Sequence, residues 1–371
     1  VGSVMKPVTD EHKVSRAKLA YLIDATAAPV CIIAPISSWA AAVSGFVEGE
    51  DGFSIFIRAI PYNFYAILTI VMMIALVLMK VDFGPMKTHE ANALKGDLFS
   101  TGKKESAQDT EIVNPKGKVI DLLIPIILLI ICCVIGMIYT GDFFAGAGFV
   151  EAFSNSDASV GLALGSICAM LLTIIIYLIR RVLNFKDCMA CLPDGFKAMV
   201  PAILILTFAW TLKAMTDSLG AATFVADAVQ KSAGSFMNFL PAIIFIVACF
   251  LAFSTGTSWG TFGILIPIVV NVFMNTNPQL MIISISACMA GAVCGDHCSP
   301  ISDTTIMASA GAQCDHVNHV STQLPYVIVV AAISFITYIV AGFAQSAWIS
   351  MPVGIVLLLL ALLVIKNMSR E

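Results

Sequence analysis

The chain has 371 residues, of which 59% are hydrophobic and 12% charged, and its formal net charge is −4 at pH 7. Soluble domains carry about 25% charged residues, so this composition excludes an ordinary soluble protein. It also excludes a nucleic-acid-binding protein, because the basic residues form no stripe with interleaved aromatic side chains. Apolar runs long enough to cross about 30 Å of hydrocarbon recur, which predicts an all-α polytopic protein in the cell membrane.

The predicted spans follow one another from the N-terminus to the C-terminus with charged loops between them. They are an interrupted span at 18–45, the spans 56–79, 119–139, 160–179 and 198–215, a hairpin at 238–273, a second interrupted span at 280–311, and the spans 323–344 and 351–365. Basic loops, such as 80–118 with its seven lysines, alternate with acidic ones. Because Lys and Arg collect on the cytoplasmic side, the two interrupted spans are predicted to run in opposite directions.

The two interrupted spans share one plan. Pro35-Ile36-Ser37 precedes a Pro-Tyr pair at 61–62, and Pro300-Ile301-Ser302 precedes a second Pro-Tyr pair at 325–326 at a nearly equal distance. Two such spans of opposite direction predict an inverted repeat, and paired interrupted spans indicate a transporter binding site. Two unrelated helices that contain proline are the alternative.

Five segments are expected from these features. They are a first repeat (1–79), a cytoplasmic linker (80–118), scaffold helices (119–197), a second repeat with the hairpin and the interrupted helix (198–345), and a C-terminal helix (346–371). The chain begins with Val1 directly beside the first repeat, so we expect an N-terminal portion of that repeat to be missing.

The second interrupted span holds the densest polar cluster of the chain. Proline removes a backbone donor, so the helix is expected to open just before Pro300. Freed carbonyls, hydroxyls and carboxylates are the oxygen ligands that a hard cation such as Na⁺ prefers. Asp296 and Asp303 lie within the span, where a charge costs about 2.5 to 3.5 kcal/mol. A buried carboxylate can hold a proton or a sodium ion in turn, so the two ions are expected to compete.

Other polar residues complete the predicted site. The hairpin is expected to be re-entrant, with its tip close to the break in the second repeat, and Asp24 and Ser37 are the candidates in the first repeat. The ion-binding candidates are Asp296, Ser299, Ser302, Asp303, Thr304, Thr255, Thr257, Ser258, Asp24 and Ser37. Capping of a helix N-terminus is the structural alternative for Asp303, and a structural role is equally open for Asp24.

The cysteines and histidines of the same region are open to other chemistries. Cysteine and histidine residues between 294 and 319 could bind zinc, but their spacing matches no closed structural zinc pattern. No metal beyond a monovalent cation, and no cofactor, is expected. His316 and His319 are expected at the cytoplasmic mouth, as surface residues or as pH-sensitive groups. An intramembrane hydrolase that uses the Asp296–Asp303 pair is the alternative from another class, and we expect no enzyme.

Three strings resemble one known family. They are GDHCSPISDTTIMASAGAQCDHVNHVSTQLPY (295–326), STGTSWGTFGILIP (254–267) and KLAYLIDATAAPVCIIAPISSWAA (18–41). The first is similar to the signature of the NhaC family of sodium/proton antiporters, and the resemblance covers essentially the whole chain. It implies inverted repeats, broken helices, re-entrant hairpins and a transport domain that moves against a scaffold. The absence that we expect of an N-terminal region departs from the family pattern, and that region is expected to be needed for a complete site.

The resemblance implies secondary active antiport of Na⁺ against H⁺ across the cell membrane. It carries over to Asp296, Ser299, Ser302, Asp303 and Thr304 in the signature, and to Thr255, Thr257 and Ser258 in the hairpin. The alternative is Na⁺- or H⁺-coupled exchange of small organic acids, such as malate and lactate, or of amino acids. The expected partners are Na⁺, H⁺ and the lipid bilayer, with a homodimer as the candidate assembly.

Overall fold

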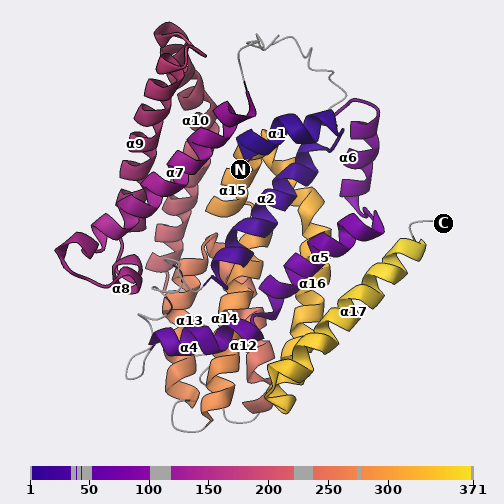
Figure 1. The fold of residues 1–371 in the computed structure, drawn as a ribbon. Helices are drawn as coiled ribbons and strands as arrows, with labels where there is room; N and C mark the ends of the chain where they lie inside the picture. Colours follow the sequence, from indigo (N-terminus) through magenta and orange to yellow (C-terminus); the bar gives the residue numbers. More distant parts are fainter. Residues whose placement is uncertain are drawn as a thin grey trace. The chain divides into compact units, whose positions relative to one another are not determined.

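The computed structural model describes residues 2–34, 39, 43, 52–100, 118–220, 237–273 and 277–368. All regular elements in this part of the chain are helices (Figure 1). Six of them are long and apolar enough to cross a membrane, and a bent pair adds a seventh candidate. The prediction of an all-α polytopic membrane protein is therefore confirmed.

The chain divides into two compact units by its internal packing. The first contains Val1–Pro35, Ala42–Gly102 and Pro201–Glu371, and the second contains Ile36–Ala41 and Lys103–Val200. The helix α10 (Phe185–Ser218) begins in the second unit and ends in the first. The five segments expected from the sequence stay a prediction.

The second unit is built around two long antiparallel helices, α7 (Val119–Thr140) and α9 (Ala158–Ile179), with the short α8 (Phe149–Ser154) between them. Small residues let the two backbones touch, since a Cβ added at Gly136 would collide with the carbonyl of Gly161. Arg180 pairs with Asp121 at 3.2 Å and so ties the far end of α9 to the start of α7.

The first unit begins with α1 (Gly2–Glu11), α2 (Arg16–Cys31), α4 (Gly52–Ala59), the 3-10 turn η1 (Ile60–Tyr62), α5 (Phe64–Met79) and α6 (Pro85–Leu94). The predicted single span 56–79 is wrong in one respect, because the chain bends by 46° between Ser54–Tyr62 and Phe64–Met79. Pro61 lies in the bend, and the side chain of Asn63 then caps α5. Proline and a capping residue stop one helix and start the next.

The unit continues with η3 (Met237–Phe239), α12 (Leu240–Thr255), α13 (Ser258–Phe273), α14 (Pro278–Cys298), α15 (Asp303–Ala312), α16 (His316–Ala344) and α17 (Ala347–Met368). α16 begins seven residues earlier than the predicted start at 323, and Pro325 lies inside it. The Pro-Tyr pairs of the two repeats therefore differ, since the first lies in a bend and the second within a helix.

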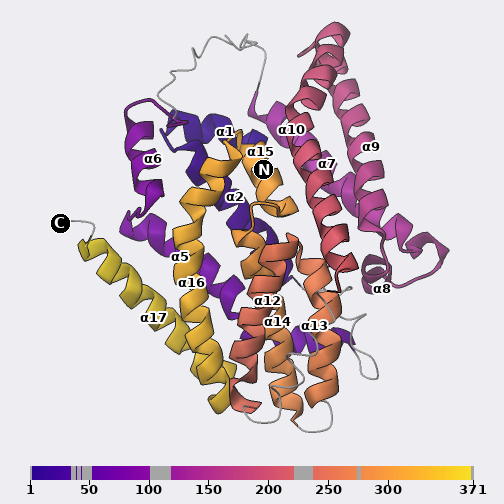
Figure 2. The same cartoon turned by 180° about the vertical axis from the view of Figure 1, so that it is seen from behind.

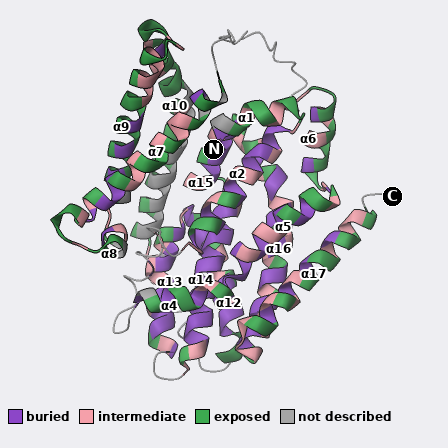
Figure 3. Ribbon diagram, in the orientation of Figure 1, coloured by how far each residue is buried: buried purple, intermediate pink, exposed green. Residues whose placement is uncertain are grey.

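The core of the first unit surrounds α14. Every residue of α14 from Leu280 to His297 is buried, and Figure 3 shows this helix as the most continuously buried of the unit. α12 packs against it backbone to backbone, because Gly291 and Gly295 on α14 face the carbonyls of Phe245 and Cys249. α12, α13 and α14 lie side by side in both views (Figures 1 and 2).

Candidate functional site

The helix of the second repeat is broken where the sequence predicts. α14 ends at Cys298, residues 299–301 are not helical, and α15 starts at Asp303 with Ser302 as its N-cap. Pro300 has no backbone donor and lies in the break. The freed carbonyl of Pro300 is bound by His316 Nε2 at 2.7 Å, so a side chain from α16 satisfies a group that the break exposes.

The tip of the α12–α13 hairpin meets this break, as predicted. Ser258 donates to Asp296 Oδ2 at 3.1 Å, and Ser299 donates to the carbonyl of Phe253 at 2.8 Å. Gly256 has a φ of +65°, and an added Cβ would lie 2.6 Å from the carbonyl oxygen of Ile301. The turn thus needs glycine both for its conformation and for the close approach of two backbones.

The two predicted carboxylates have different surroundings. The Asp296 residue is 1% exposed, and its Oδ1 has no hydrogen-bond partner among the described residues. Asp303 is partly buried and accepts a bond from Thr304 N at 2.8 Å. The N-cap of α15 is Ser302, and Asp303 is the first residue of the helix. The alternative that Asp303 is the capping residue is therefore wrong. Of these two carboxylates, Asp296 is the one with a buried oxygen, Oδ1, that accepts no hydrogen bond from a described residue.

The other predicted residues of the second repeat lie around the same point. Ser302 and Thr304 bond to each other through their hydroxyls at 2.9 Å. Thr255 donates to the carbonyl of Leu251 at 2.8 Å at the end of α12, and Thr257 lies in the turn itself. Of the residues predicted in the first repeat, Ser37 lies outside the described residues, as does Pro35, where the first break was predicted.

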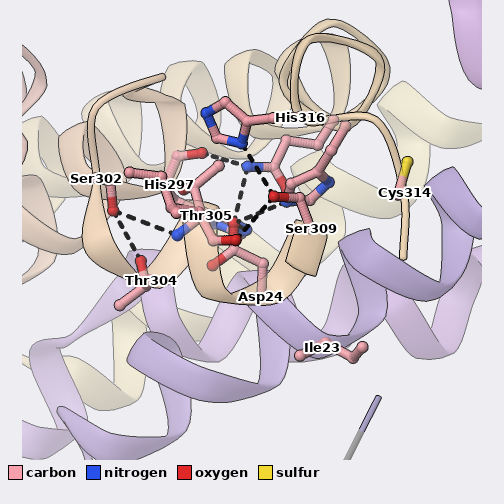
Figure 4. A network of polar contacts seen from close by, with 12 residues as sticks. Ile23, Asp24, His297, Ser302, Thr304, Thr305, Ser309, Cys314 and His316 are labelled. Carbon is pink, nitrogen blue, oxygen red and sulfur yellow. Dashed lines mark hydrogen bonds and ion pairs between the residues drawn. The ribbon is translucent and has the colours of Figure 1, made fainter. Parts of the chain in front are cut away.

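The remaining predicted residue, Asp24, belongs to a second polar group, here called the Asp24 cluster (Asp24, His297, His319 and Gln323). Asp24 on α2 accepts a bond from Gln323 Nε2 at 2.9 Å, and its Oδ2 lies 3.3 Å from His319 Nε2 and 3.8 Å from His297 Nε2. Each of the four residues is at most 1% exposed. Figure 4 shows Asp24 pointing from α2 toward the residues around the break.

Sequence reasoning did not predict this cluster. The expectation that His319 is a surface residue is wrong, because its side chain is fully buried beside Asp24. Its location at the cytoplasmic mouth stays a prediction. His316 contacts the break and bonds to Ser309 at 3.0 Å. A usable signal was present, since His319 and Gln323 are four residues apart and therefore share one face of a helix.

The cluster is not assigned to a transition metal. Within the described residues, no three His, Cys, Asp or Glu side chains are grouped as ligands of a metal ion. Imidazole and thiolate ligands of zinc need such a grouping in tetrahedral geometry. The polar atoms around Asp296 include oxygens of carboxylates, hydroxyls and backbone carbonyls, a kind of ligand that suits a hard monovalent cation.

Comparison with known proteins gives one consistent family. The sequence pattern of the Na⁺/H⁺ antiporter family matches residues 19–343. An uncharacterized protein of Haemophilus influenzae is 39% identical over 99% of this chain and 72% of its own length. The malate-2H⁺/Na⁺-lactate antiporter of Bacillus subtilis is 28% identical over 56% of this chain and 42% of its own length.

Two further relatives match this chain over a shorter length. An uncharacterized Na⁺/H⁺ antiporter of Haemophilus influenzae is 36% identical, and the arginine/ornithine antiporter of Halobacterium salinarum is 33% identical. Each match covers 28% of this chain and 22% of the relative, so the chain spans less than half the length of the relatives with a named activity. No solved structure matches the chain.

Proposed function

The chain belongs to the Na⁺/H⁺ antiporter family, and from that premise we propose that it exchanges Na⁺ for H⁺ across the cell membrane at the junction of the hairpin tip and the broken helix. Family membership, together with six helices among the described residues that are long and apolar enough to cross a membrane, supports a multi-pass transporter. The proposed site is the set of oxygens around Asp296, and its proposed cargo is one ion at a time.

The observation that supports this proposal best is the unpartnered Oδ1 of Asp296. The carboxylate is buried in the membrane-spanning part of the chain, and no Lys or Arg pairs with it among the described residues. A charge in that position costs about 2.5 to 3.5 kcal/mol unless it is neutralised. Either a proton or a sodium ion neutralises it, and only one of them fits at a time.

The helix ends around Asp296 add to this preference. α12 and α14 end at the junction and present carbonyl oxygens, whose partial negative charge favours a cation. α13 and α15 begin there, and their N-termini favour a negative group. Asp303 in the first turn of α15 supplies such a group from the protein itself.

The first test is transport by the purified protein in liposomes. Vesicles loaded with NaCl and diluted into sodium-free buffer should acidify inside, because Na⁺ leaves and H⁺ enters. Asp296→Asn should reduce the acidification to the level of empty vesicles. The variant should still fold, since it removes a buried charge that is costly in the membrane. Asp303→Asn should also slow the exchange, because it removes the second carboxylate of the junction. Its effect should be smaller than that of Asp296→Asn.

Asp194→Asn is the matched control, because this aspartate on α10 is 75% exposed and pairs only with the exposed Lys197 among the described residues. It should acidify like the wild type. Wild-type acidification rates in Asp296→Asn would show that the carboxylate assignment is wrong.

The exchanger alternative predicts instead that sodium alone has no effect and that malate, lactate or an amino acid is required. The helix N-termini of α13 and α15 would then receive the carboxylate of the solute.

A further inference from the structure

An open cavity of about 620 Å³ lies where α5 and α17 end beside α6. Three lysines line it, namely Lys80 directly after α5, Lys87 on α6 and Lys366 in the last turn of α17. The ends of α5 and α17 lie close to α6 in both views (Figures 1 and 2). Several basic side chains on one concave surface attract an anion.

The two carboxylates of the cavity wall already have partners. Asp82 pairs with Lys18 of α2 at 2.8 Å and accepts a bond from the hydroxyl of Tyr326 at 2.9 Å. Glu90 lies 3.5 Å from the same Lys18 and accepts a bond from the backbone N–H of Ser15 at 2.9 Å. Because Lys18 offsets part of their negative charge, the lysines give the cavity a positive balance.

Two of the lysines are available to a ligand in the cavity. Lys80 is exposed, and within the described residues its ammonium group pairs with no carboxylate. Lys366 donates to the carbonyl of Met79 at 3.0 Å, so its ammonium group lies at the C-terminal end of α5. An ammonium group carries three donors, so this bond leaves Lys366 able to donate to a ligand as well.

The surface next to the cavity is apolar. Leu78, which lines the cavity, and its neighbour Val77 are exposed on α5, and Leu363 and Val364 are exposed on α17 one turn before the end of that helix. Exposed apolar side chains beside lysines are typical of the point where a helix leaves the hydrocarbon of a membrane. The loop that starts at Lys80 is one of the basic loops predicted on the cytoplasmic side.

From this arrangement we propose that the cavity binds the phosphate of an anionic phospholipid, whose acyl chains lie against the exposed apolar side chains of α5 and α17. Phosphate is the chemistry that the lysines recognise, and the apolar surface next to them favours a lipid over a soluble phosphate. Basic cavities between membrane helices on the cytoplasmic side bind anionic headgroups. The lipid joins the ends of α5 and α17 to α6 and stabilises the fold there. This binding site is separate from the ion site at Asp296 and does not depend on the proposed exchange.

The experiment titrates lipid into the purified protein in a neutral detergent and follows thermal unfolding. A ligand that binds only the folded protein raises the melting temperature, and the dependence on its concentration gives an apparent affinity. Phosphatidylglycerol, which carries one negative charge, should bind more tightly than phosphatidylcholine with the same acyl chains. Lys80→Gln should weaken the binding of phosphatidylglycerol about fivefold, and Lys80→Gln combined with Lys366→Gln about 25-fold. The affinity for phosphatidylcholine should stay unchanged in both variants.

The matched control is Lys197→Gln, because this lysine on α10 is 77% exposed and does not line the cavity. It should bind phosphatidylglycerol like the wild type. Glycerol phosphate, which has the phosphate without the acyl chains, should leave the melting temperature unchanged. Equal protection by glycerol phosphate and phosphatidylglycerol would show that the ligand is a soluble phosphate and would overturn the lipid proposal. Equal affinity of the wild type for the two lipids, or unchanged affinity for phosphatidylglycerol in the double variant, would overturn it as well.

A measurement on the unmodified protein covers the case in which Lys366→Gln does not fold, since that change also removes the bond to Met79. Salt screens the attraction between exposed charges but not the contact of acyl chains with apolar side chains. Raising KCl from about 0.1 to about 1 M should therefore remove the preference for phosphatidylglycerol over phosphatidylcholine. A preference that is the same at both salt concentrations would show that the lysines do not hold the headgroup.

Discussion

The contact between the hairpin tip and the break makes a prediction about Gly256→Ala. This glycine has a φ of +65°, a conformation that costs an L-residue about 1–2 kcal/mol. The added Cβ would lie 2.6 Å from the carbonyl oxygen of Ile301 and 2.8 Å from its Cγ1. Backbone atoms cannot move away without shifting the break, so overpacking adds about 1–3 kcal/mol. The expected total loss is about 2–5 kcal/mol.

Gly220→Ala is the matched control for this change. Gly220 has a φ of +71°, and a Cβ added there would have no atom of the described part of the chain within 4 Å. The variant should therefore lose only the conformational contribution, about 1–2 kcal/mol. Thermal unfolding in detergent, followed by tryptophan fluorescence, measures both variants. Gly256→Ala should melt at a lower temperature than Gly220→Ala and transport sodium more slowly. Equal melting temperatures would show that the tip does not press on the break.

Two further predictions concern other parts of the chain. Gly136→Ala should destabilise the second unit by about 1–3 kcal/mol, because the new methyl group collides with the Gly161 carbonyl between α7 and α9; its melting temperature measures this. His89 lies in the charged helix α6, and burial lowers the pKa of its imidazole. The folded state then binds a proton less readily than the unfolded state, so the stability that this histidine contributes is present above about pH 6.5 and falls at lower pH. His89→Gln should flatten the stability curve between about pH 5 and 6.5, and an unchanged curve would contradict this.

Local rules predicted the break and the hairpin well, for physical reasons that are visible in particular residues. Pro300 cannot continue a helix, and Ser302 is a good N-cap, so the end of α14 and the start of α15 follow from the sequence. Gly256 likewise identifies the tight turn between two apolar arms. Pro61 and the N-cap Asn63 are residues of the same kinds and indicate the bend before α5, but the bend was not predicted.

The Asp24 cluster could not be predicted in the same way, because tertiary packing assembles it. Asp24 on α2 lies near the N-terminus, far in the sequence from His297 on α14 and His319 on α16, and each residue alone has an ordinary local explanation. The predicted first break, around Pro35, falls outside the described residues, so the inverted repeat stays a prediction.

The most direct test of the account is the binding of ²²Na⁺ to the purified protein as a function of pH. If sodium and protons compete for Asp296, the apparent sodium affinity should fall by about tenfold per pH unit on the acid side. Asp296→Asn should bind no sodium at any pH, whereas Asp194→Asn should bind like the wild type. Sodium binding that is independent of pH, or that persists in Asp296→Asn, would contradict the claim that one buried carboxylate holds either ion in turn.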